Sequence, residues 1–204
     1  MVAMLDKPGL ALAILFGAAI LIFGGAPYLA MMLFFLLLAI VVTKYGYYEK
    51  KEMGIYEHDR SWENVLSNGL VPAIAALLSP SIGPLPYIAA IAAVTSDKFA
   101  SELGVLSGDP ISLDGFKRVK PGTSGAVSAL GFVTSLAGAA LVGISAIFLF
   151  GVSPAIALLV ALAGFAGSMA DTLFGILEER GMGTKGTTNI ICAAVGAAIG
   201  FYIR

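Results

Sequence analysis

The stretch GFAGSMADTLFGILEER, residues 164–180, decides the fold of this chain. It places Asp171 inside a run of apolar and small residues that is long enough to sit in a membrane. Steps of four and three residues put five side chains on one face of a helix: Gly164, Ser168, Asp171, Gly175 and Glu178. A carboxylate at bilayer depth is costly unless it is paired or faces a water-filled site, so the stretch predicts a functional site. The alternative is a structural aspartate that a lysine or backbone donors neutralise.

The composition predicts an integral membrane protein, which we expect in the plasma membrane of a prokaryote. Of the 204 residues 58% are hydrophobic, and the mean hydropathy is +0.93. The 25 glycines suit helices that approach one another closely in lipid. A net charge of −1 leaves no large basic surface, which excludes nucleic acid as a partner. The single cysteine, Cys192, excludes an internal disulfide.

Hydropathy predicts an all-α polytopic protein that forms one transmembrane domain over residues 1–204. Seven spans are expected, at residues 10–23, 27–43, 64–78, 84–103, 123–150, 154–179 and 187–203. Three connections between them are hydrophilic, at residues 44–63, 104–121 and 180–186. These three loops carry nearly all the lysines and arginines, whereas the connections GGAP, SPSIG and GVS carry no charge. The positive-inside rule therefore predicts a cytoplasmic N-terminus, cytoplasmic hydrophilic loops and an outside C-terminus.

The sequence predicts a second acidic helix, because the fourth span ends in VTSDKFASELG, residues 94–104. Asp97 lies roughly 20 Å from the outer end of its span and Asp171 roughly 25 Å from its own, at about 1.5 Å per residue. The two carboxylates are therefore expected at comparable depth, with Glu102 and Glu178 one to two turns beyond. Carboxylates that converge with phosphates and water suit Mg²⁺. The predicted metal ligands are Asp97, Glu102, Asp171 and Glu178.

Two glycine- and threonine-rich segments precede the fifth and seventh spans, and both are expected to expose backbone N–H groups at a helix N-terminus. Neither matches the Walker pattern, and ordinary helix capping is the alternative interpretation. Ser124, Ser128 and Asn189 also lie on stripes of small residues that are typical of helix packing. The expected phosphate and nucleotide contacts in and beside the segments are Pro121, Gly122, Thr123, Ser124, Gly125, Ser128, Gly186, Thr187 and Asn189, with Ser101 and Ser168 on the acidic helices.

Basic residues lie next to both segments. Lys117, Arg118 and Lys120 precede the first, and Lys185 belongs to the second. The order acidic helix, basic loop, glycine-threonine helix start thus occurs twice, around residues 97–128 and 171–189. This order predicts a degenerate repeat with a phosphate site at its interface.

Four motifs together resemble the TMEM19-like family of membrane proteins, which includes the plant and cyanobacterial phytyl phosphate kinases. They are Arg60 with Asn64, Val65, Asn68 and Gly69, then TSDKFASELG, KRVKPGTSGAVS and GSMADTLFGILEE. The resemblance implies a kinase that uses CTP or another nucleoside triphosphate to convert a prenyl monophosphate into the diphosphate, with Arg60 and Asn68 among the nucleotide contacts. The pattern KR-x-x-PG-x-x-G is also similar to a segment of membrane cytidylyltransferases and polyprenol kinases, which implies CTP. Residues 181–188 depart from the family's last motif.

The resulting hypothesis is a Mg²⁺-dependent kinase with its site at the cytoplasmic surface. Asp97 and Asp171 hold the metal on the nucleotide, while Lys120 and Lys185, with Lys117 and Arg118, neutralise charge in the transition state. The expected partners are a nucleoside triphosphate, a prenyl phosphate lipid and membrane lipids. Open alternatives are a kinase acting on the free alcohol, a transporter and a scaffold without chemistry. The sequence leaves the oligomeric state open, a homodimer included.

Overall fold

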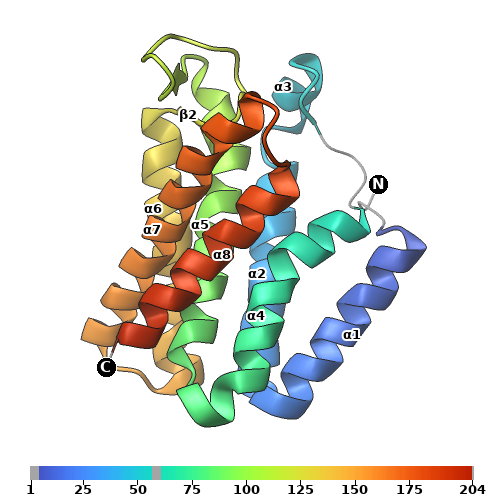
Figure 1. Ribbon diagram of the computed structural model, residues 1–204, viewed down its shortest axis with the longest axis vertical. Helices are drawn as coiled ribbons and strands as arrows, with labels where there is room; N and C mark the ends of the chain where they lie inside the picture. The colour runs from blue at the N-terminus through green and yellow to red at the C-terminus, as the bar shows by residue number, and fades with distance from the viewer. Residues whose placement is uncertain (1–4, 57–60, 204) are drawn as a thin grey trace.

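The computed structural model describes residues 5–56 and 61–203. Seven long helices run along a common direction, and short elements gather at one end (Figure 1). In chain order the elements are α1 (Lys7–Gly24), α2 (Ala26–Lys44), α3 (Tyr47–Glu52), α4 (Trp62–Ile82), α5 (Leu85–Gly104), the 3-10 turn η1 (Val105–Ser107), β1 (Ile111–Ser112), β2 (Ala126–Val127), α6 (Ala129–Phe150), α7 (Pro154–Glu179) and α8 (Lys185–Tyr202). We call the end that carries α3, residues 105–128 and residues 180–184 the polar end.

The all-α polytopic class is confirmed. Five helices, α1, α2, α4, α6 and α7, are long and apolar enough to cross a membrane. Each of the seven expected spans corresponds to one long helix, and α7 has the bounds that the sequence predicts. The strands β1 and β2 are two residues each and pair antiparallel within the loop between α5 and α6.

The expected start of the fifth span is wrong. We expected a helix from residue 123, but α6 begins at Ala129. Gly122 and Gly125 have φ angles of +88° and +71°, so the chain is in the left-handed region at both positions and cannot yet be helical. Between residue 123 and the start of α6 the chain instead forms a turn and then the strand β2.

Helix α5 lies at the centre of the bundle and contacts α2, α4, α6, α7 and α8 (Figure 1). Its alanines face glycines of its neighbours: a Cβ atom added to Gly164 of α7 would lie 2.5 Å from the Cβ of Ala92. One added to Gly196 of α8 would lie 2.7 Å from the carbonyl oxygen of Ala89. The small-residue stripes are therefore packing faces, as expected for helices that associate in lipid. This packing carries Asp97 of α5 towards α7 and α8.

The two acidic helices are each followed by a returning helix, α6 after α5 and α8 after α7. The connections differ, since the first spans residues 105–128 with its strand pair and the second only residues 180–184. The two halves share the order of their elements but not the structure of their loops.

Candidate functional site

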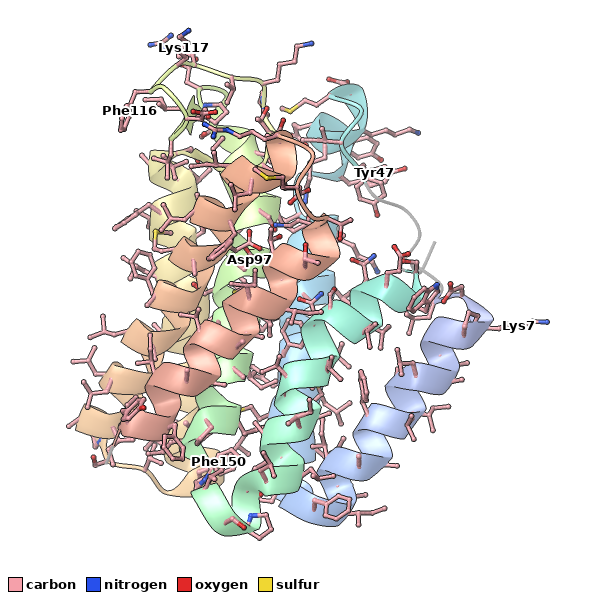
Figure 2. The ribbon with its side chains drawn as sticks, in the orientation of Figure 1. Lys7, Tyr47, Asp97, Phe116, Lys117 and Phe150 are labelled. Atoms are coloured by element: carbon pink, nitrogen blue, oxygen red, sulfur yellow. The ribbon has the colours of Figure 1, made fainter. Side chains whose placement is uncertain are left out.

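A cleft of about 340 Å³ lies among α5, α6, α7 and the loop before α6 near the polar end. Its volume falls in the range of small-molecule sites, roughly 300–1,000 Å³. Figure 2 shows Asp97 inside the bundle, below the loop that carries Phe116 and Lys117. The polar or charged side chains and turn residues that line the cleft are Asp97, Ser101, Pro121, Gly122, Thr123, Ser124, Gly125, Ser128, Asp171, Thr172, Glu178 and Lys185. The sequence therefore predicted most of the polar lining.

Asp97 and Asp171 face a single lysine. Asp171 is buried, and its Oδ2 accepts a hydrogen bond of 2.8 Å from Nζ of Lys185. The other oxygen, Oδ1, is buried without a hydrogen-bond partner among the described residues. Asp97 is also buried and lies close enough to Asp171 and Lys185 for their charges to interact. One ammonium therefore serves two buried acidic side chains.

Glu178 lies two turns beyond Asp171 on α7 and also lines the cleft. Its Oε2 is the second buried carboxylate oxygen without a partner in the described part of the chain. The described residues contain no group of three His, Cys, Asp or Glu side chains that could hold a metal ion alone. The aspartate pair, with its unpartnered Oδ1 of Asp171, fits Mg²⁺ in its usual mode, in which one or two carboxylates bind and phosphates and water complete the shell.

The turn at residues 121–125 is fixed directly on α7. A Cβ atom added to Gly175 would lie 2.5 Å from the backbone nitrogen of Gly125, so only glycine allows this approach. The N–H of Ser124 donates to Oε1 of Glu179 at 2.9 Å. These contacts hold the turn over the cleft, one helical turn from Asp171.

We expected residues 121–125 to expose N–H groups at a helix N-terminus, but they end before α6 begins at Ala129. Their role as an anion site stays a prediction. The Oγ of Ser128 accepts a hydrogen bond of 3.0 Å from the N–H of Gly131 and donates one of 3.1 Å to the carbonyl of Gly104. Ser128 thus caps the start of α6 and connects it to the end of α5. The turn residues Thr123 and Ser124 line the cleft from the loop, ahead of the helix.

The second glycine-threonine segment contributes one residue to the cleft, Lys185. Thr184 and Thr187 form a capping box at the start of α8, which occupies the Thr187 hydroxyl. Gly186 packs towards α4, where a Cβ added to it would lie 3.8 Å from the Cβ of Ser67. Gly186 and Thr187 therefore do not line the cleft, and here the ordinary capping interpretation describes the structure.

Glu102 lies away from the cleft, which corrects its expected place beside Asp97. Five residues separate the two on α5, so their side chains point about 140° apart around the helix axis. Oε2 of Glu102 accepts from Nζ of Lys50 at 2.8 Å, and Oε1 accepts from Thr43 at 3.0 Å and from Lys98. Lys50 is 2% exposed and also donates to the carbonyl of Val42. Glu102 thus belongs to an ion-pair network that joins α2, α3 and α5.

The loop cations lie on the rim. The three loop cations Lys117, Arg118 and Lys120 are exposed and do not line the cleft. In Figure 2 Lys117 lies at the polar end and points outward from the bundle. Arg118 pairs with Asp109 at 3.5 Å, and both side chains are exposed. Arg60, the remaining expected cation, lies outside the described residues.

Three other expected contacts lie elsewhere, two of them buried (Ser168 and Asn189) and one half-buried (Asn68). Ser168 joins Ser135 and Ser96 in a chain of hydroxyl hydrogen bonds, 3.1 Å and 2.7 Å long, that links α7, α6 and α5. Asn189 donates to the Oγ of Ser67 on α4 at 3.5 Å, and Asn68 donates to the same oxygen at 3.3 Å. Ser168, Asn68 and Asn189 do not line the cleft. They stabilise the helix packing beside it.

Sequence reasoning missed the apolar wall, which is formed by Phe132 of α6 and Met169 of α7. Helical spacing gave a signal for the first, since Phe132 lies four residues after Ser128. Met169 directly follows Ser168 and belongs to no polar pattern, so no signal marked it.

We expect Gly175→Ala to lower any activity of this cleft by about a hundredfold, because its methyl group would displace the turn at residues 121–125 by about 1 Å. Turnover or ligand affinity of purified protein measures the effect. Gly17→Ala is the matched control, since a Cβ there meets only Leu29 at 3.9 Å. Equal activity of both variants would show that the position of the turn is unimportant.

The fold and the cleft define a helical integral membrane protein with a charged site at one end of its bundle. Residues 1–198 match the family described as "Integral membrane protein DUF92", and the chain belongs to this family. It is 39% identical to an uncharacterized membrane protein of Methanocaldococcus jannaschii over 204 residues, which take in 98% of this chain and 85% of that one. It is 29% identical to Protein PGR of Arabidopsis thaliana over 187 residues, and that alignment takes in 74% of this chain and 64% of the plant protein. No solved structure matches.

Proposed function

We propose that the protein is a membrane kinase that transfers a phosphoryl group from CTP or another nucleoside triphosphate to a prenyl monophosphate, as in the phytyl phosphate kinases of the TMEM19-like family. The observation that carries the proposal is the cleft itself. It combines Asp97, Asp171, Glu178 and Lys185 with an apolar wall, and one carboxylate oxygen each of Asp171 and Glu178 has no hydrogen-bond partner among the described residues. A site for a phosphate-bearing lipid and a metal-bound nucleotide needs this combination of acidic, basic and apolar groups.

In the proposed reaction the bond between the γ-phosphorus and its bridging oxygen breaks, and a bond to a phosphate oxygen of the acceptor forms. The nucleoside diphosphate and a prenyl diphosphate are the products. Mg²⁺, when bound, would neutralise charge on the nucleotide phosphates, and Asp97 and Asp171 are the residues that would hold it, with Glu178 two helical turns away on α7. Lys185 then faces the transferring group with its ammonium charge, and the turn at residues 121–125 orients the phosphates.

The acceptor follows from the groups at hand. An alcohol must lose a proton as it attacks, which favours a positioned general base, whereas a phosphate monoester is already anionic near neutral pH. No histidine among the described residues lines the cleft, and its two aspartates are assigned to the metal. Charge neutralisation and alignment therefore suffice for a monophosphate. Glu178 as a base for a free alcohol is the rival assignment.

Purified protein in detergent, given Mg²⁺ with CTP or ATP, tests the function. We expect geranylgeranyl or phytyl phosphate to be converted into the diphosphate at least about a hundredfold faster than the matching alcohol is phosphorylated. The absence of a general base typically lowers a rate by about this factor or more. An equal or faster rate with the alcohol would identify a prenol kinase. No product with any acceptor, together with ion or solute flux in proteoliposomes, would identify a transporter.

The apolar half of the bundle favours the kinase over the transporter. The buried residues of α5 between Tyr87 and Val94 are aromatic or aliphatic, and the Tyr87 hydroxyl donates to the carbonyl of Tyr28 at 2.6 Å. An ion path needs polar groups through the whole depth. The described polar clusters instead lie in the half of the bundle near the polar end.

The proposal requires the polar end to face the cytoplasm, where nucleotides are present. In a Cys192→Ala background, single cysteines at Ser81 and Ser153, both exposed near the opposite end, are expected to react with an impermeant maleimide from outside intact cells. Cysteines at Asp109 and Met182 are exposed at the polar end and should react only after permeabilisation. Labelling of Asp109→Cys from outside would rule out cytosolic nucleotide as the substrate.

A further inference from the structure

We infer that the acceptor lipid enters the cleft sideways, through an opening between α6 and α7 that is bordered by Phe132, Met169 and Thr172, and that its isoprenoid chain lies on the outer surface of these two helices. The inference rests on the proposed function for the identity of the lipid. It adds the entry route and the residues that contact the chain.

The two helices are in close contact below the cleft. Near the end opposite the polar end, a Cβ added to Gly143 of α6 would lie 2.6 Å from the carbonyl oxygen of Ala157 of α7. Further along, Ser135 and Ser168 are hydrogen bonded at 3.1 Å. Phe132, which lines the cleft, packs edge to face on Phe165 of α7, with the ring centroids 5.0 Å apart. From there to the polar end, residues of both helices line the cleft.

The cleft reaches the outer surface of the bundle at this point. Phe132 lines the cleft and is nevertheless 49% exposed, and Met169 and Thr172 are half-buried. Beside them the outer surface is apolar, with Val133 on α6 and Leu173 on α7 both largely exposed. In a membrane protein such a surface faces lipid. The opening therefore joins the hydrocarbon phase to the charged groups.

The chemistry across the opening selects one kind of occupant. The buried Asp97 and Asp171 line one part of the cleft together with Lys185, and Phe132 and Met169 line its apolar part. A molecule that spans both parts has an anionic head, which the metal and Lys185 receive, and a hydrocarbon chain that stays in lipid. The loop at residues 121–125 packs on α7 through Gly125 and Gly175 and covers the cleft at the polar end. Entry from the side also keeps the hydrocarbon chain in lipid and out of water. A prenyl monophosphate has these two parts.

Photocrosslinking tests the route without requiring turnover. Wild-type protein in nanodiscs is irradiated with geranylgeranyl phosphate that carries a diazirine on the isoprene unit nearest the phosphate. We expect label on peptides containing Phe132, Phe165 or Met169, and loss of that label with excess unmodified geranylgeranyl phosphate. Competed label on α1, α4 or α8 instead would overturn the inference. Because this readout is binding, it stands even if no diphosphate is formed, in which case the proposed function alone fails.

A pair of tryptophan variants tests the opening by kinetics. Met169→Trp fills the opening, and we expect the KM for geranylgeranyl phosphate to rise about tenfold. Dimethylallyl phosphate has a much shorter chain, so its kcat/KM should change by no more than about twofold. Ile14→Trp, on the exposed apolar surface of α1 and outside the cleft lining, is the control and should behave as wild type. Equal losses with both acceptors, or equal behaviour of the two variants, would contradict lateral entry at this place.

Discussion

Asp171→Asn is expected to lower turnover by about three orders of magnitude, and Asp97→Asn by a similar factor, while both variants stay folded. Asparagine keeps the shape of the side chain and removes the charge that would hold Mg²⁺ on the nucleotide. It also directs an amide dipole, in place of a carboxylate, at the ammonium of Lys185, which lies 2.8 Å from Oδ2 of Asp171. The fold should tolerate the change, since Lys185 is 47% exposed and can be solvated when its partner is lost.

The measurement is kcat at saturating prenyl phosphate and Mg-CTP, with the melting temperature as a test of folding. Glu102→Gln removes the same charge from α5 at a position outside the cleft, so it should lower the melting temperature and leave kcat within about threefold. Loss of the Glu102 charge weakens the network with Lys50 and Lys98. Normal turnover of either asparagine variant would remove that aspartate from the site, and a large loss in Glu102→Gln would restore the role that we first expected for it.

The contrast between Asp171 and Glu102 shows how far the sequence predicts the site. The spacing of small and polar residues in α7 is local information, and it placed Asp171, Gly175 and Glu178 on one face. In the structure Asp171 and Glu178 line the cleft, and Gly175 packs against Gly125 of the loop beside it. The depth of Asp97 follows from counting along α5 in the same way. Properties that depend on a single helix were therefore predictable, including the bounds of α7.

The environment of Glu102 depends on Lys50, which is 52 residues away in the sequence. Only the i,i+4 partner Lys98 was visible in the local pattern. The loop before α6 was mispredicted for a related reason. Its left-handed glycines are stabilised by the contact of Gly125 with Gly175, and a contact across 50 positions has no local signature. Helix propensity of the residues around 123–128 is a weak preference that such a contact overrides.

The two lysines that the sequence placed in one catalytic role are now distinguishable. Lys185→Met is expected to lower turnover about a hundredfold to a thousandfold, because Lys185 is the one lysine or arginine that lines the cleft among the described residues. Without it, Asp97 and Asp171 lose the cation that competes with a metal ion for their oxygens, so the variant should also need a lower Mg²⁺ concentration for half-maximal rate. Lys120→Met should change turnover by no more than about threefold, since the side chain is exposed on the rim and outside the cleft lining.

Steady-state rates across a Mg²⁺ titration decide between the two lysines. A second comparison separates the charge of Lys185 from its pairing with the acid: Lys185→Met in the Asp171→Asn background removes both partners of the 2.8 Å contact. If the lysine acts mainly by holding Asp171 in place, the double variant should be little worse than Asp171→Asn alone. If Lys185 acts on the transferring phosphoryl group, its loss should lower the rate further in that background. A loss in Lys120→Met as large as that in Lys185→Met would mean that the loop folds over the substrate and brings its rim cations to the phosphates, and the site would then have to include them.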